Sequence, residues 1–239
     1  SMSKAKSAFI QFVFYGAYFL MAVPAGMLMQ KVGYKRGIII GLLLFAGGAF
    51  LMFPATFIQT FGSFLICLFI IACGLTCLET AANPYTTVLG PPEYAERRIN
   101  FSQSFNGLGW IAGPLVGGIL IFSGSGGGNK FSTIALPYML IGTLVLIVAI
   151  FFWRIKFPPV REEIEASATD NSGSIRDLLK YPHFILAVVA QFLYVAAQTG
   201  VNSFFINYVT EELPALTNRQ ASLILGIGGM GLFWLGRFT

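Results

Sequence analysis

The charged residues of this sequence are separated by long stretches without any Lys, Arg, Asp or Glu. Only 10% of its 239 residues are charged, whereas a soluble domain carries roughly 25%. The uncharged stretches lie between Lys6 and Lys31, Arg36 and Glu79, Arg98 and Lys130, Lys130 and Arg154, Lys180 and Glu211, and Arg219 and Arg237. A helix that crosses a bilayer needs about 20 mostly apolar residues. The sequence therefore predicts an all-α polytopic membrane protein, and it argues against a disordered chain or a soluble enzyme.

The uncharged stretches predict seven membrane-spanning helices. Their expected ranges are 8–30, 37–58, 61–88, 101–122, 134–154, 183–208 and 219–238. The third is long, and we expect it to kink at Pro84, because proline removes a backbone donor and clashes with the preceding turn.

The Lys and Arg residues predict how these helices are oriented. If the N-terminus lies outside, eleven Lys and Arg residues face the cytoplasm and four face outward, as the positive-inside rule requires. The net charge of +5 is then explained by cytoplasmic loops, and no nucleic-acid partner is expected. Stretch 155–182 is rich in Pro, Glu and Ser, which predicts a cytoplasmic linker. It would join a helical bundle at 1–154 to the start of a second bundle at 183–239.

Glu79 lies inside the third predicted helix, and no Lys or Arg lies in the body of a predicted helix to pair with it. An acid at mid-membrane costs about 2.5–3.5 kcal/mol, so it normally faces a cavity or a partner. Burial of an unpaired carboxyl favours its neutral form. Such a group would hold a proton when sealed and release it when water arrives, which predicts a proton-coupling site. The alternative is a carboxyl that only hydrogen-bonds to neighbouring helices.

Amide side chains on the same and the next helix predict a sugar-binding cavity. Asn83 follows Glu79 by one helical turn, so both can face one side. Gln103 and Asn106 are three residues apart on the next helix. Together these groups offer donors and acceptors suited to sugar hydroxyls, and aromatic rings such as Phe105 and Trp110 suit stacking on a sugar. Asn83 has a second interpretation, in which it holds the kink at Pro84.

Polar residues of the sixth predicted helix extend the same hypothesis. Gln198 and Asn202 fall close to one face and predict a further wall of the cavity. Amides also join helices to one another inside membranes, and this alternative stays open for all of these amides.

The three cysteines, Cys67, Cys73 and Cys77, lie in one apolar stretch with no His nearby. Their spacing fits no zinc pattern, so we interpret them as small residues that pack between helices. The sequence contains no phosphate-binding loop, Ser-His-Asp set or metal-ligand pattern. Neither an enzyme nor a metal or cofactor is therefore expected.

The segment Gly26-Met27-Leu28-Met29-Gln30-Lys31-Val32-Gly33-Tyr34-Lys35-Arg36 resembles the loop motif of the major facilitator superfamily, Gly-x-x-x-Asp-Arg-x-Gly-Arg-Lys/Arg. Here Gln30, Lys31 and Tyr34 replace the Asp, the first Arg and the second Arg of that motif. Four further runs resemble the L-fucose permease branch, the fucose/galactose/glucose:proton symporters. They are Gly74-Leu75-Thr76-Cys77-Leu78-Glu79-Thr80-Ala81-Ala82-Asn83-Pro84, Gln103-Ser104-Phe105-Asn106, Ala197-Gln198-Thr199 and Glu211-Glu212-Leu213-Pro214.

The resemblance implies a secondary active transporter that carries L-fucose or another hexose together with a proton by alternating access. Glu79 matches the fourth-helix acid that the branch uses for proton coupling and sugar binding. Gln103 and Asn106 match fifth-helix positions at its sugar cavity. The expected partners are a monosaccharide, a proton and the lipid bilayer of a bacterial inner membrane, and a monomer is expected.

The resemblance also implies that the chain is incomplete. It corresponds to the second through eighth helices of a twelve-helix fold, so the first-helix aspartate of the branch has no counterpart here. We therefore expect this fragment not to transport by itself.

Two other functions stay open at this point. The run Gly113-Pro114-x-x-Gly117-Gly118 resembles a fifth-helix motif of proton antiporters, which would make the protein a drug or metabolite antiporter of the same superfamily. A seven-helix receptor is the more distant alternative, because the last predicted helix has no lysine for a retinal Schiff base.

Overall fold

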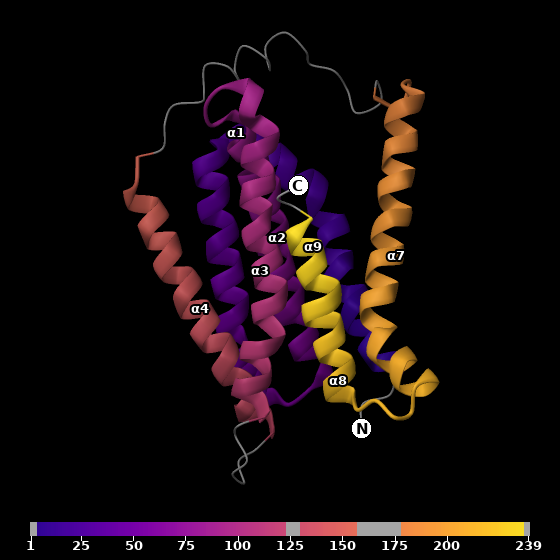
Figure 1. The fold of residues 1–239 in the computed structure, drawn as a ribbon. Helices are drawn as coiled ribbons and strands as arrows, with labels where there is room; N and C mark the ends of the chain where they lie inside the picture. Colours follow the sequence, from indigo (N-terminus) through magenta and orange to yellow (C-terminus); the bar gives the residue numbers. More distant parts are fainter. Residues whose placement is uncertain (1–3, 123–129, 157–177, 237–239) are drawn as a thin grey trace. The chain divides into compact units, whose positions relative to one another are not determined.

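The computed structural model describes residues 4–122, 130–156 and 178–236, and all regular structure within these ranges is helical. The all-α prediction is thereby confirmed (Figure 1). The chain forms two compact units. Unit 1 comprises Ser1–Ile99 and Pro114–Pro159, and unit 2 comprises Asn100–Gly113 and Val160–Thr239. The predicted linker falls mostly on residues outside the described ranges, so the division into two bundles at 155–182 stays a prediction.

Helix α1 (Lys4–Ile58) contains the first two predicted spans in one 55-residue element. The two are separated at Gly33, whose φ of 78° and ψ of 168° are not helical. Glycine adopts a positive φ at little cost because it lacks a Cβ atom. The expected loop between the spans is therefore a break at one glycine. We call residues 4–32 the N-half of α1 and residues 34–58 its C-half.

The other helices of unit 1 follow the uncharged stretches closely. Helix α2 (Phe61–Val88) begins where the hydroxyl of Thr60 accepts a hydrogen bond from the amide of Ser63 at 3.4 Å, and it continues through Pro84. A 3₁₀ turn, η1 (Pro92–Tyr94), connects it to α3. Helix α3 (Ala95–Phe122) begins earlier than predicted and contributes its middle part to unit 2. Helix α4 (Lys130–Arg154) completes unit 1.

The core of unit 1 lies where α1 packs against α2 and α4. The C-half of α1 approaches α2 at glycines, since a Cβ added to Gly41 would lie 2.9 Å from the carbonyl oxygen of Gly74. Small residues of this kind let membrane helices pack backbone to backbone. The three cysteines are buried on α2 as free thiols within the packed clusters of unit 1, which confirms their predicted role as packing residues.

Unit 2 contains α7 (Pro182–Glu212) and a shorter helical segment that begins at Asn218. That segment comprises α8 (Asn218–Leu223), the π-helix η2 (Ile224–Met230) and α9 (Gly231–Leu235). It starts at a capping box, in which Thr217 and Gln220 each bond the backbone amide of the other. Gly107 of α3 faces this segment, because a Cβ there would lie 3.1 Å from the Trp234 ring.

Four stretches of the described residues are long and apolar enough to cross a membrane. They are Phe9–Ile58, Phe61–Val88, Ala135–Arg154 and Pro182–Glu212. The first has 50 residues, more than one span needs, and it breaks at Gly33 into the two predicted spans. The remaining two predicted spans correspond to α3 and to the shorter apolar stretch Gln220–Leu235.

Candidate functional site

Glu79 forms a hydrogen bond that the sequence did not predict. The Tyr18 hydroxyl, on the N-half of α1, donates to Oε1 of Glu79 on α2 at 3.3 Å. Glu79 is exposed on its helix, and Tyr18 is half-buried. The sequence pattern of Lys and Arg residues offers Glu79 no partner inside a helix, and its partner in the structure is a tyrosine. A phenol in the middle of an apolar span is the signal that points to such a partner, because its hydroxyl needs an acceptor there.

Small residues bring the two side chains together. Ala17 and Ala72 are fully inaccessible and Cys73 is nearly so, and these three residues form one buried cluster between the N-half of α1 and α2. Tyr18 packs against this cluster. Glu79 follows Ala72 by seven residues, or two helical turns, so it lies on the same face of α2. The close approach at the alanines therefore sets the distance at which Tyr18 reaches Glu79.

Asn83 lies one turn beyond Glu79 on α2 and is half-buried. The four-residue spacing puts both residues on one side of the helix, as the sequence predicts. Unit 1 therefore presents a carboxyl and an amide in succession along α2.

In unit 2, the predicted amide pair of α3 is in contact. Nδ2 of Asn106 donates to Oε1 of Gln103 at 3.3 Å, across one turn of the helix. Phe105 is exposed, and its ring packs edge-on against Phe101 at a centroid distance of 5.3 Å. The side chain of Trp110 lies outside the described part of the chain. The amide pair thus presents one oriented group with both donor and acceptor capacity.

Gln198 and Asn202 are half-buried on α7, four residues apart. Because α7 is helical through both residues, they share one face of the helix. The structure thus joins Glu79 to Tyr18 in unit 1 and Gln103 to Asn106 in unit 2. The single cavity predicted for all six residues stays a prediction.

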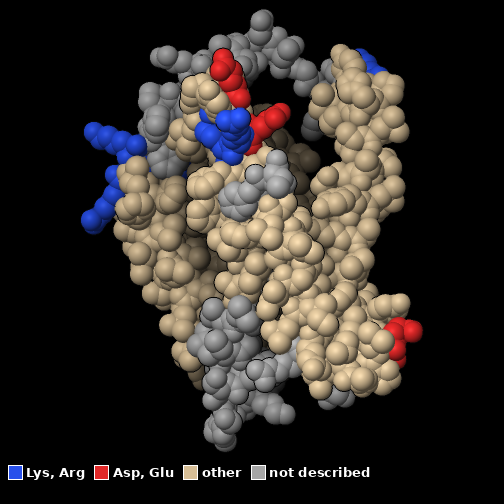
Figure 2. Space-filling view, viewed as in Figure 1, with Lys and Arg blue, Asp and Glu red and all other residues tan. Residues whose placement is uncertain are grey.

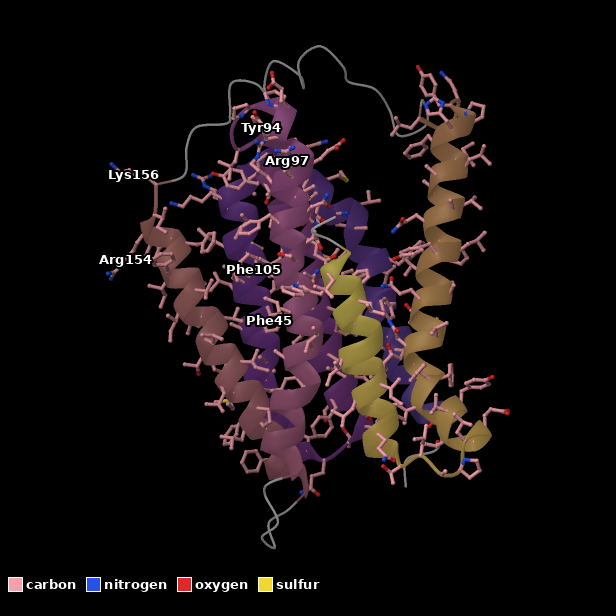
Figure 3. All side chains as sticks on the ribbon, in the orientation of Figure 1. Phe45, Tyr94, Arg97, Phe105, Arg154 and Lys156 are labelled. Carbon is pink, nitrogen blue, oxygen red and sulfur yellow. The ribbon has the colours of Figure 1, made fainter. Side chains whose placement is uncertain are left out.

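Cationic side chains of unit 1 bind the ends of its helices. Nζ of Lys35 donates to the carbonyl oxygens of Trp153 and Ile155, at 3.0 and 2.6 Å, where α4 ends. In Figure 2 the visible Lys, Arg, Asp and Glu atoms of this unit lie in its upper half, and Figure 3 places Tyr94 and Arg97 near the upper end. Phe45, by contrast, lies midway along the helices.

The described residues contain no group of three His, Cys, Asp or Glu side chains placed to hold a metal ion.

The comparisons with known proteins cover the whole chain. Residues 1–239 match the family model described as the Major Facilitator Superfamily. The chain is 40% identical over 259 residues to the L-fucose-proton symporter of Escherichia coli (strain K12), covering 100% of this chain and 59% of that protein. It is 37% identical over 217 residues to a glucose/galactose transporter of Brucella abortus, covering 90% of this chain and 52% of that protein.

A solved structure agrees with these sequence matches. The crystal structure of the transporter FucP in the outward conformation superimposes with a TM-score of 0.79 and 38% identity, over 100% of this chain and 62% of that one. The chain thus spans between half and two thirds of the length of these relatives. The resemblance to the L-fucose permease branch is confirmed, and the receptor alternative is wrong. The chain belongs to the major facilitator superfamily, and four of its described stretches are long and apolar enough to cross a membrane.

Proposed function

We propose that the protein is a secondary active transporter that carries a monosaccharide, L-fucose or another hexose, together with a proton by alternating access. The observation that carries this proposal is a carboxyl inside a membrane helix, Glu79, hydrogen-bonded to Tyr18, in a chain 40% identical to an L-fucose-proton symporter. In alternating access, two helical bundles rock against each other around a fixed binding site. The activity is transport and not catalysis.

Glu79 is the proton-coupling residue in this proposal. A carboxyl on a membrane helix binds a proton when its surroundings exclude water and releases it when water reaches the group. Its hydrogen bond with Tyr18 gives the ionised form a donor at 3.3 Å. Glu79 also offers acceptors to a sugar hydroxyl, so protonation and sugar binding would affect each other.

The substrate-binding residues of the proposal are Glu79 and five amides. The amides are Asn83, Gln103, Asn106, Gln198 and Asn202. Support comes from their side chains, because an amide both donates and accepts, as sugar hydroxyls require. The contact between Asn106 and Gln103 orients one such pair. The partners are a monosaccharide, a proton and the bilayer, and the protein acts as a monomer.

We place the protein in a bacterial inner membrane with the N-terminus of this chain outside. Support comes from the Lys and Arg residues, eleven of which fall on the cytoplasmic side in that orientation and four on the other. Residues 155–182 then lie in the cytoplasm.

In the full-length protein in proteoliposomes, Glu79→Gln is expected to abolish the accumulation of labelled sugar driven by an inward proton gradient. Exchange of labelled for unlabelled sugar persists, because a neutral amide occupies the place of the protonated carboxyl and exchange requires no proton release. Both rates are measured on the same vesicles.

The matched control is Glu96→Gln, which neutralises an exposed acid in the first turn of α3. It should leave accumulation and exchange unchanged. Gradient-driven accumulation by Glu79→Gln at the wild-type level would rule out the proton role of Glu79.

Binding of L-fucose, galactose or glucose is expected to raise the melting temperature of the full-length protein in detergent. A ligand that binds only the folded state stabilises it by an amount that rises with the logarithm of its concentration above the Kd. Matched non-sugar osmolytes serve as the control. If no hexose responds while hydrophobic cations do, the antiporter alternative is favoured.

A further inference from the structure

The two halves of α1 contact α2 in different ways. The C-half is held backbone to backbone, since a Cβ on Gly74 would meet the amide nitrogen of Phe45 at 2.5 Å. The N-half meets α2 at the cluster of Ala17, Ala72 and Cys73 and through the hydrogen bond from Tyr18 to Glu79. The break at Gly33 separates the two halves. The carboxyl of Glu79 is thus hydrogen-bonded to the N-half of α1, which contacts α2 through side chains and not through close backbone packing.

The chemistry of this pair depends on whether Glu79 carries a proton. An ionised carboxylate only accepts hydrogen bonds, and the phenol is a donor at neutral pH. Such a charge-assisted bond is stronger than one between neutral groups. When Glu79 is protonated, its own O–H competes for partners and the phenol contributes less. The Tyr18 hydroxyl therefore stabilises the ionised form of Glu79 more than the neutral form.

The surroundings hold Tyr18 in place for this task. Its ring lies 5.6 Å from the ring of Phe14 and 6.3 Å from that of Tyr15. Tyr15 is exposed, whereas Tyr18 is half-buried and packs against the cluster with Ala17. Besides this pair, the titratable side chains are Lys4, Lys6, Tyr15 and Lys31 on the N-half of α1 and Cys67, Cys73, Cys77 and Tyr85 on α2. A ring fixed on two sides keeps its hydroxyl directed at Glu79 with little loss of rotamer freedom on binding.

We propose that Tyr18 is a positioning residue for proton release: its hydroxyl holds the Glu79 carboxylate after the proton has left. This inference rests on the proposed proton-coupling role of Glu79. In the step, the Glu79 carboxyl loses its proton to water, and the phenol keeps its own proton while donating a hydrogen bond. Net uptake requires this release in every cycle, whereas sugar exchange does not. Loss of the hydroxyl therefore slows net uptake and spares exchange.

The test is Tyr18→Phe in the full-length protein in proteoliposomes, with the hexose that stabilises the wild type as the probe. This variant keeps the ring and its contacts with Phe14 but removes the hydroxyl. We expect gradient-driven net uptake to fall about tenfold, the size expected for one hydrogen bond to a charged group, with exchange unchanged. The matched control is Tyr15→Phe, which removes a hydroxyl from the same aromatic cluster and should change neither rate.

Equal losses of uptake and exchange in Tyr18→Phe would mean a packing role only and would overturn the inference. Unchanged uptake in that variant would overturn it as well. The double variant Tyr18→Phe with Glu79→Gln has no carboxylate to hold, so it should exchange sugar as fast as Glu79→Gln alone; a further loss contradicts the inference. If Glu79→Gln itself accumulates sugar normally, the proposed function fails instead, so the two failures are distinguishable.

Discussion

Replacing Gly74 by alanine is expected to destabilise the protein by about 3 kcal/mol, the upper end of the usual cost of overpacking. The new Cβ would lie 2.5 Å from the amide nitrogen of Phe45 and 2.7 Å from the carbonyl oxygen of Gly41. Both neighbours are backbone atoms, so no side chain can rotate away and the two helices must separate. The separation would also expose the buried residues on either side of the contact. The measurement is the melting temperature of the purified protein in detergent.

The matched control for this substitution is Gly47→Ala in the same half of α1. Gly47 has no atom within 4 Å of an added Cβ, and alanine is favoured over glycine in a helix by about 1 kcal/mol. This variant should melt at or above the wild-type temperature. Equal melting temperatures for Gly74→Ala and Gly47→Ala would show that the close contact between α1 and α2 does not limit stability.

The sequence predicts the helices of unit 1 well because long apolar stretches without charge cover most of their length, although Pro24, Pro54, Pro84 and Pro137 lie inside helices. Helix α2 covers Phe61–Val88, the predicted range. The break between the first two spans is harder to predict, because a loop and a single residue of positive φ look alike in a sequence. In the structure the break consists of one residue, Gly33, and helical residues lie on both sides of it. Helix α3 starts early because its charged first turn contributes a side chain that binds the end of α2.

The last predicted span shows a different limit. Apolar composition indicates a helix over 219–238, but composition alone cannot distinguish an α-helix from a π-helix. The π-helix at Ile224–Met230 depends on backbone hydrogen bonds one residue longer than usual. Three glycines in that stretch, Gly226, Gly228 and Gly229, lower the cost of such a distortion.

The candidate site also contains residues that the sequence predicts and one residue that it does not. Glu79 stands out in the sequence because a charge inside an apolar stretch is rare, and the spacing of Gln103 and Asn106 predicts their contact across a helical turn. Tyr18 does not stand out, because tyrosine is one of many aromatic residues here and its partner lies 61 positions away. That pairing depends on how two helices pack at Ala17 and Ala72, which no local pattern encodes.

Arg98 connects the end of α2 to the start of α3 through four carbonyl groups. Its guanidinium donates to the carbonyl oxygens of Thr86 at 3.2 Å, Thr87 at 2.7 Å and Pro91 at 2.8 Å, and to that of Gly90 at 3.5 Å. The last carbonyls of a helix have no partner within the helix, and a cation there also interacts favourably with the helix dipole. One planar side chain thus satisfies the end of α2 and fixes the turn that follows it.

Replacing Arg98 by methionine is expected to destabilise the protein by about 2 kcal/mol, because the carbonyls of a half-buried helix end lose a charged donor. Arg98→Lys should recover only part of the lost stability, since an ammonium is a compact charge and cannot reach four acceptors at once. The matched control is Arg97→Met, whose guanidinium lies exposed, 5.7 Å from the Tyr94 ring centroid, a contact worth about 0.5–1 kcal/mol. The loss of stability is measured by the melting temperature in detergent and by the rate of protease cleavage in the turn at 89–94. Cleavage that is as fast in Arg97→Met as in Arg98→Met would mean that the carbonyl contacts of Arg98 do not hold this turn.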